Sequence, residues 1–205
     1  MRTSLSMTAL ATLLLMACSP PVKTVVPSAP ESTTMAADAF FARLHALCGK
    51  AYAGRLVAFT EADAASFGGT PVMHVRECSA NEIRIPFHVG EDRSRTWVVT
   101  RTASGLRLKH DHRHVDGSSD ALTMYGGDSR SAGDGTAQRQ EFPADAESKA
   151  LFAEGGLVAS IDNVWAIEVE PGVAFAYELR RPKRHFRVEF DLSSAVVPPP
   201  PPWGH

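Results

Sequence analysis

The sequence predicts a mainly β domain, an antiparallel barrel with an N-terminal helix and one further short helix. Three observations lead to this prediction. Beyond about residue 50, apolar residues recur at every second position, which is the period of a half-buried strand. Turn-forming pairs such as Asp116-Gly117 and Pro171-Gly172 separate these segments at short intervals. Helical spacing of apolar residues is confined to two stretches, near 36–48 and 145–153.

A closed barrel is preferred over a two-sheet sandwich. About eight to ten short strands at even spacing are typical of both architectures. Closure, however, removes the exposed edge strands that invite aggregation. Barrels of this size also commonly enclose a small ligand, so the preferred fold carries an expectation about function.

The elements follow in order along the chain. In the first helix, residues 36–48, Phe40, Leu44 and Leu47 form an apolar stripe, and Gly49 is a plausible helix stop. Strands are then expected at residues 52–60, 71–78, 82–89, 95–102, 105–114, 121–125 and 136–142. Pro86 lies inside one of them, which predicts an edge or bulged strand there. After the short helix, the last strands are expected near 160–169, 173–179 and 185–192.

The N-terminus carries a targeting signal, residues 1–17. Arg2 precedes an apolar stretch, residues 5–16, that is shorter than the ~20 residues needed to span a bilayer. The stretch runs into the letters LMAC, which resemble the lipobox of bacterial lipoproteins. This resemblance implies cleavage before Cys18, acyl chains on Cys18 and therefore a membrane partner. Ser19 at the next position implies the outer membrane, with the domain facing the periplasm. The alternative is an ordinary secretory signal that ends near a cysteine.

Composition sets the remaining boundaries. Residues 18–35 are rich in Pro, Ser and Thr and form a tether, 36–192 form the folded domain, and 193–205 form a proline-rich tail. The tail is either disordered or docked through Trp203. The net charge of the chain is -2, which gives no basic surface for nucleic acid as a partner.

The chain contains three cysteines. If Cys18 is lipidated, Cys48 and Cys78 remain as an even pair in an oxidising compartment. That pair predicts a disulfide, with two buried free thiols as the alternative.

The strand at 105–114 contains the main candidate site. Alternate side chains of a strand share a face, so an apolar row continues into an imidazole row formed by His110, His112 and His114. His110 and His112 are spaced to share one zinc ion, with His114 or His74 as a third ligand. An open fourth position would hold water for metal-assisted hydrolysis. The alternative is histidines at a barrel mouth that are solvated or paired with a nearby aspartate.

Arginines offer a second candidate site. If the strands pair in sequence order, Arg76 and Arg84 approach one another. Facing inward, they would favour an anionic ligand with a carboxylate or phosphate group. The alternative is cross-strand ion pairs on the outer face of the barrel.

Two resemblances accompany these patterns. The letters GKAYAG, which follow a helix and begin a strand, resemble the start of the first strand in lipocalin-like (calycin) barrels. The architectural resemblance covers residues 36–192. In this resemblance Tyr52 stands at the aromatic position of the first strand, where the usual residue is Trp, and Arg187 stands at the basic position of the last strand. Tyr52 therefore joins the candidate ligand-binding residues. The stretches VMHVREC, IRIPFHVGEDRSRTWV and LRLKHDHRH resemble an uncharacterised family of proteobacterial lipoproteins, which implies no activity.

The function expected from the sequence is binding without catalysis. The sequence has no Gly-x-Ser-x-Gly, His-Glu-x-x-His, phosphate-loop or Cys-x-x-Cys motif. We therefore expect a lipid-anchored envelope barrel that binds a small molecule or an envelope protein. The alternatives are a metal site, with zinc as the cofactor, and a structural protein without a ligand.

Overall fold

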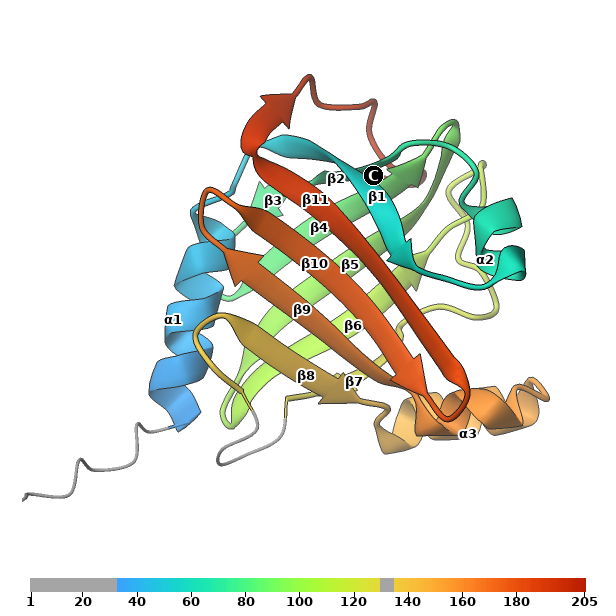
Figure 1. The fold of residues 1–205 in the computed structure, drawn as a ribbon. Coiled ribbons are helices and arrows are strands. Elements are labelled where there is room, and N and C mark those ends of the chain that lie inside the picture. The colour runs from blue at the N-terminus through green and yellow to red at the C-terminus, as the bar shows by residue number, and fades with distance from the viewer. Residues whose placement is uncertain (1–32, 130–134) are drawn as a thin grey trace, which may run out of the picture. The chain divides into compact units, whose positions relative to one another are not determined.

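A computed structural model describes residues 33–129 and 135–205 of the chain. Within these residues the chain forms a nearly closed antiparallel barrel of ten strands with three α-helices (Figure 1). The predicted fold class is confirmed. Cys18, the expected signal peptide and nearly all of the expected tether lie outside the described residues. No helix within the described residues is long and apolar enough to cross a membrane.

The barrel is an up-and-down arrangement in which most strands pair with a strand adjacent in sequence. The sheet order is β7-β6-β5-β4-β2-β1-β11-β10-β9-β8, and the short β3 pairs with β4. The first strand pairs with the last, so the two ends of the sheet are β7 and β8. The strands are β1 (Ala51–Ala58), β2 (Pro71–His74), β3 (Glu77–Cys78), β4 (Glu82–Val89), β5 (Asp92–Thr102), β6 (Gly105–His112), β7 (Tyr125–Asp128), β8 (Arg139–Pro143), β9 (Val164–Glu170), β10 (Ala174–Arg181) and β11 (Arg184–Val196).

The seam between β7 and β8 is closed by the chain that follows β8. The backbone N–H of Asp145 donates to the carbonyl of Gly126 over 3.0 Å. The Ser148 hydroxyl, on α3 (Ala146–Glu154), accepts from the N–H of Gly126 over 2.7 Å and donates to its carbonyl over 3.0 Å. A side chain on Gly127 would meet the carbonyl oxygen of Pro143 at 1.8 Å, so only glycine allows this approach.

Helix α1 (Thr33–His45) closes one end of the barrel, at the left in Figure 1. Its apolar stripe is buried in the core, as the sequence predicted for Phe40, Leu44 and Leu47. Because α1 fills this end of the barrel, we call it the plug. The guanidinium of Arg101 lies 4.2 Å from the ring centre of Phe41, so a cation covers the outer edge of the plug. A turn ends the helix region at Gly49, which has a φ of 79°.

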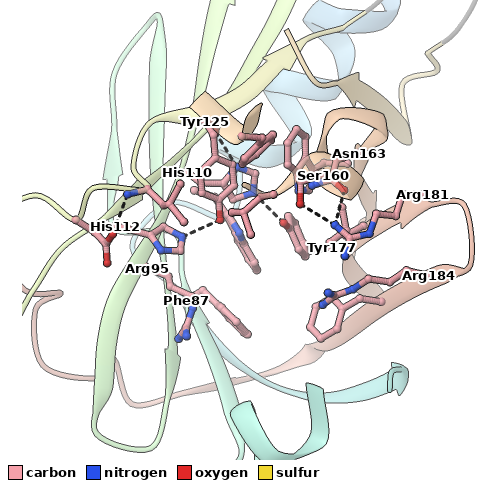
Figure 2. A pocket seen from close by; sticks show the side chains of 18 of the residues that line it. Phe87, Arg95, His110, His112, Tyr125, Ser160, Asn163, Tyr177, Arg181 and Arg184 are labelled. Atoms are coloured by element: carbon pink, nitrogen blue, oxygen red, sulfur yellow. Dashed lines mark hydrogen bonds between the residues drawn. The ribbon is translucent and has the colours of Figure 1, made fainter. Parts of the chain in front are cut away.

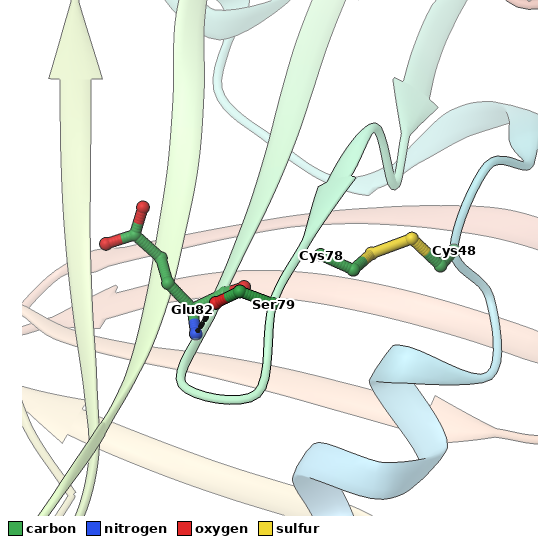
Figure 3. The surroundings of a disulfide bond; sticks show 4 residues. All are labelled: Cys48, Cys78, Ser79 and Glu82. Atoms are coloured by element: carbon green, nitrogen blue, oxygen red, sulfur yellow. Dashed lines mark hydrogen bonds between the residues drawn. A yellow bond between two sulfur atoms is a disulfide. The ribbon is translucent and has the colours of Figure 1, made fainter.

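The predicted disulfide is confirmed. Cys48 and Cys78 are bonded, with their Cα atoms 6.3 Å apart and a sequence separation of 30 (Figure 3). The bond joins the turn after α1 to β3 and therefore holds the plug against the barrel wall.

The surroundings of Pro86 correct the edge-strand half of one prediction, whereas the bulged half agrees with a register irregularity between Phe87 and Val89. β4 is an interior strand rather than an edge, because it pairs with β5 on one side and with β2 and β3 on the other. In the register of the sheet Phe87 pairs with β2 and Arg84 pairs with β3. Pro86 therefore lies opposite the gap between these two short strands. The missing N–H of proline therefore costs no ladder hydrogen bond on that side.

Two further elements differ from the sequence predictions. Helix α2 (Glu61–Ser66) was not predicted, although the side chain and N–H of Thr60 form a reciprocal capping box with Asp63. β7 lies at Tyr125–Asp128 rather than at 121–125. Both of its glycines allow close backbone approaches, Gly126 to Leu108 of β6 and Gly127 to Pro143 at the seam.

The proline-rich tail lies against the outer face of the barrel. β11 continues to Val196, four residues beyond the predicted domain boundary at 192. The backbone N–H of Trp203 donates to the backbone carbonyl of Arg93 over 3.1 Å. The guanidinium of Arg93 donates to the carbonyl of Pro201 over 3.1 Å. His205 Nε2 lies 3.1 Å from the carboxylate of Asp111. The docked form, one of the two alternatives for this segment, is the one the structure contains.

We predict that the disulfide contributes strongly to stability. Replacing Cys48 and Cys78 together by serine should lower the free energy of unfolding by about 3–4 kcal/mol, because a loop of this length is then free in the unfolded chain. Urea unfolding monitored by tryptophan fluorescence measures the change. Wild-type protein unfolded with a reductant present is the matched control and should show a similar loss, whereas equal midpoints for all three samples would contradict the prediction.

Candidate ligand-binding site

A cavity of about 430 Å³ lies at the end of the barrel away from α1. Its walls come from strands on both sides of the barrel and from segments around the rim, including Phe67 just after α2, helix α3 and the short 3-10 helix η1 (Val158–Asp162). Figure 2 shows this lining. The lining residues are Phe67, Phe87, Arg95, Trp97, His110, His112, Asp120, Leu122, Tyr125, Phe152, Leu157, Ser160, Asn163, Trp165, Tyr177, Leu179, Arg181, Arg184 and Phe186.

The bottom of the cavity is a stack of aromatic rings. Trp97 of β5 stacks on Phe87 of β4 with ring centres 4.8 Å apart. It also stacks on Tyr177 of β10, from the opposite wall, at 4.4 Å. Only 2% of the Trp97 surface is exposed. The rings therefore separate the cavity from the packed core beneath it and present an apolar, planar surface to anything above.

His110 is held as a neutral donor and acceptor. Its Nδ1 lies 3.0 Å from the carbonyl of Tyr125, and its Nε2 lies 2.8 Å from the hydroxyl of Tyr177. A carbonyl can only accept, so Nδ1 carries the hydrogen and Nε2 accepts from the tyrosine. Burial, followed by the neighbouring His112, lowers the pKa of His110 to about 3.

His112 belongs to the same hydrogen-bonded group and faces the cavity. Its Nε2 lies 3.1 Å from the hydroxyl of Tyr125. Burial, followed by the charge of Arg95, lowers the pKa of His112 to about 4. Burial raises the pKa of Tyr125 to about 12, so the phenol keeps its proton. At neutral pH His112 and the Tyr125 hydroxyl therefore present a ligand with neutral hydrogen-bonding groups and no charge.

The structure does not bring the four predicted zinc ligands together. His110 and His112 share the inward face, as strand geometry required, but the carbonyl of Tyr125 and the hydroxyl of Tyr177 occupy the two nitrogens of His110. β6 ends at His112, so His114 lies in the following turn and is exposed. His74 lies on β2 and does not line the cavity. Within residues 33–129 and 135–205, no group of three His, Cys, Asp or Glu side chains is arranged to hold a metal ion.

Arg76 and Arg84 are also placed outside the cavity. In β4 the buried residues Ile83, Ile85 and Phe87 face inward, so the alternate residue Arg84 faces outward. There it lies 2.7 Å from the carboxylate of Asp111, and Arg76 lies 2.5 Å from Glu77. Arg84 therefore forms the cross-strand ion pair that was the alternative for these arginines, whereas Arg76 is paired with its neighbour in sequence.

The two residues of the calycin resemblance lie apart. Tyr52 is buried in the core, outside the cavity lining, and faces Ala195 across the β1–β11 pair. Arg187 faces Ala58, toward the other end of the same pair. Arg187 donates to the carboxylates of Glu168 and Glu178.

Three other arginines line the cavity instead, and sequence reasoning missed them. Arg95 is two residues from Trp97, Arg181 is two from Leu179, and Arg184 is two from Phe186. Each therefore shares a strand face with an apolar residue that lines the cavity. This alternation was visible in the sequence and would have identified all three.

The rim arginines differ in their partners. Arg95 donates to Asp92, and Arg184 donates to Asp63, which the capping box of α2 holds in place. Arg181 has neutral partners, the Ser160 hydroxyl at 2.7 Å and the Asn163 side-chain oxygen at 3.4 Å. Burial, followed by the charge of Arg184, lowers the pKa of Arg181.

Comparison of the chain with protein-family models, curated proteins and solved structures gives no match. The function is therefore argued from the cavity itself: an aromatic floor, two neutral histidines and three arginines at the mouth.

We predict that His110 makes the fold sensitive to acid. Its pKa is about 3 in the folded protein and close to 6.5 in the unfolded chain, so between these values the unfolded state binds one more proton. The free energy of unfolding should fall as the pH is lowered through this window, by ~1.4 kcal/mol per pH unit for this group. Replacing His110 by Gln should remove that part of the slope.

Urea unfolding at several pH values between about 5 and 7 measures the slope. His114→Gln is the matched control, because His114 lies close by in sequence but is exposed. Identical slopes for the wild type and the His110→Gln variant would show that this histidine is not held neutral.

Proposed function

We propose that this protein is a non-catalytic binding protein of the bacterial cell envelope that holds a small, largely apolar molecule in the barrel cavity. The observation that carries the proposal is the cavity of about 430 Å³ with its aromatic lining. This volume falls within the ~300–1,000 Å³ range of pockets that hold small molecules. Predominantly apolar walls with a few polar groups at the mouth are typical of such sites.

The difference between the two barrel ends supports this proposal. At one end α1 fills the interior with Phe40, Phe41 and Leu44. At the other end the rim segments surround the cavity without filling it. A barrel whose only role is structural gains stability from packing both ends, because buried apolar contacts stabilise the fold.

The envelope location is part of the same proposal. The N-terminal lipobox resemblance supports a lipid anchor at Cys18, with the outer membrane as the destination and the periplasm as the side the barrel faces. The Cys48–Cys78 bond fits this location, because disulfides form and persist in the periplasm and are rare in the cytosol.

We predict that the cavity binds the neutral, fluorescent apolar probe N-phenyl-1-naphthylamine. Wild-type protein should increase its fluorescence saturably, with one site per chain. Replacing Leu179 by Trp should weaken binding by about tenfold or more, equivalent to ~1.4 kcal/mol, because the larger side chain occupies the cavity.

Val173→Trp is the matched control for this titration. Val173 is 55% exposed and precedes β10 at the end away from the cavity, so the added ring should not alter binding. No saturable binding by the wild type, or equal loss in both variants, would count against a ligand cavity and favour a structural or protein-binding role.

We predict that Cys18→Ser releases the protein from the membrane fraction and abolishes incorporation of labelled palmitate. Each buried methylene of an acyl chain contributes ~0.8 kcal/mol to membrane binding, and the serine variant carries no thioether-linked chains. Ser19→Ala, which leaves the lipidated residue in place, is the control and should remain in the membrane fraction. Retention of both variants in that fraction would refute the lipid anchor.

A further inference from the structure

We infer that the bound molecule is an amphipathic organic anion, with its anionic group against Arg181 and Arg184 and its apolar body against the aromatic floor. The inference rests on the proposed binding function and adds the chemical class of the ligand. Four features of the rim support it.

The first feature is a pair of like charges placed directly opposite each other. Arg181 of β10 and Arg184 of β11 are register partners at the end of their hairpin, and both line the cavity. Figure 2 shows the two side chains on the same wall. Like charges at directly opposed positions destabilise a strand pair unless negative charge is supplied nearby. Asp63 supplies one carboxylate, to Arg184.

The second feature is the contrast with the outer face of β8, β10 and β11. Arg180, Arg187 and Arg139 each contact two or more carboxylates, drawn from Glu141, Glu168, Glu178 and Glu189. Arg181 is adjacent to Arg180 in sequence but faces inward. Within the described residues no carboxylate oxygen lies within 4.0 Å of its guanidinium nitrogens. An anion at this position would supply the missing charge.

The third feature is the number of unused hydrogen-bond donors. A guanidinium has five N–H groups. Arg184 Nε is buried and has no hydrogen-bond partner in the part of the chain that the structure describes. Arg181 uses only Nη1 toward Ser160 and Asn163 within that part of the chain. Adjacent guanidinium groups with free donors match the oxygens of a carboxylate or a similar anion.

The fourth feature is the arrangement of the other charges around the mouth. Asp120 lines the cavity from the segment after β6, across the barrel from β10 and β11. Its carboxylate accepts the N–H of Leu122 over 2.8 Å and would repel an anion on that side. Arg95, beside it, is already paired with Asp92. The anionic group is therefore directed to the Arg181 side of the mouth.

The position of the apolar body follows from the neighbours of these arginines. Phe186 and Leu179 lie two residues inward along the same strands, and Phe67 of the α2 region packs on Phe186 with ring centres 5.0 Å apart. Deeper in the cavity the stacked rings of Trp97 and Tyr177 form the floor. A ligand held by its anionic group at the mouth would thus direct its rings or chain onto aromatic surface.

A pair of probes that differ only in charge tests this inference on the full chain. 8-Anilinonaphthalene-1-sulfonate has the ring system of N-phenyl-1-naphthylamine plus one sulfonate. The wild type should bind the sulfonate at least about fivefold more tightly than the neutral probe. Added salt should reduce that preference, because it screens the partly exposed arginines.

Substitutions then assign the preference to one side chain. Arg181→Gln should reduce the ratio of the two affinities to near one, and Arg181→Lys should restore part of it, because the charge returns without the planar fork. Arg180→Gln, which removes the neighbouring outward arginine, should leave the ratio unchanged. Near-ultraviolet circular dichroism checks that each variant keeps its packed aromatic core.

The outcomes separate the inference from the proposed function. If the wild type binds the neutral probe equally well or better, the anion preference is wrong while the ligand cavity stands. If the preference exists but Arg180→Gln removes it as effectively as Arg181→Gln, the preference arises from general surface charge and the assignment to Arg181 is wrong. If neither probe binds saturably, the proposed function itself fails.

Discussion

The site depends on closure of the barrel between β7 and β8. These strands are the two ends of the sheet, and the hydrogen bonds that Gly126 makes with Asp145 and Ser148 close the gap between them. Tyr125 precedes that seam and contacts both cavity histidines, through its carbonyl and its hydroxyl. An open seam would admit water to these groups, and burial is the main reason that the histidines stay neutral. Backbone closure thus determines the electrostatics of the cavity.

Closure also makes residues from opposite walls into neighbours. Trp97 and Tyr177 belong to strands five places apart in a ten-strand order, yet their rings stack across the interior. The hydroxyl of Tyr177 also hydrogen-bonds to His110 on a third strand. One aromatic cluster therefore supports the floor, orients the imidazole and limits the depth of the cavity. A ligand above it would meet a rigid surface, which lowers the entropic cost of binding.

The parts of the structure that follow from local periodicity were predictable from the sequence. The apolar stripe of α1, the span of β4 and the shared inward face of His110 and His112 each depend on residue spacing alone. Arg76 and Arg84 were misassigned as possible inward residues, although the apolar alternation in β4 already placed Arg84 outside. What spacing could not supply was the set of hydrogen-bond partners that other strands bring to each side chain. The tyrosines that occupy the nitrogens of His110 come from β7 and β10, so a zinc site and a hydrogen-bonded pair looked alike in the sequence.

The same residue type has opposite roles at the two ends of the barrel, and its partners decide which. Arg101 and Arg95 lie six residues apart on β5 and face the same interior. Arg101 contacts Asp38 and covers the Phe41 ring, so its charge and its surface are both used to hold the plug. Arg181 at the other end has only a hydroxyl and an amide oxygen as partners, and a second arginine directly opposite. The outer arginines of the barrel contact several carboxylates, whereas Arg181 contacts no carboxylate among the described residues. The unmatched charge lies beside an aromatic cavity, so the proposed amphipathic anion would contact the guanidinium with its charged group and the rings with its apolar body.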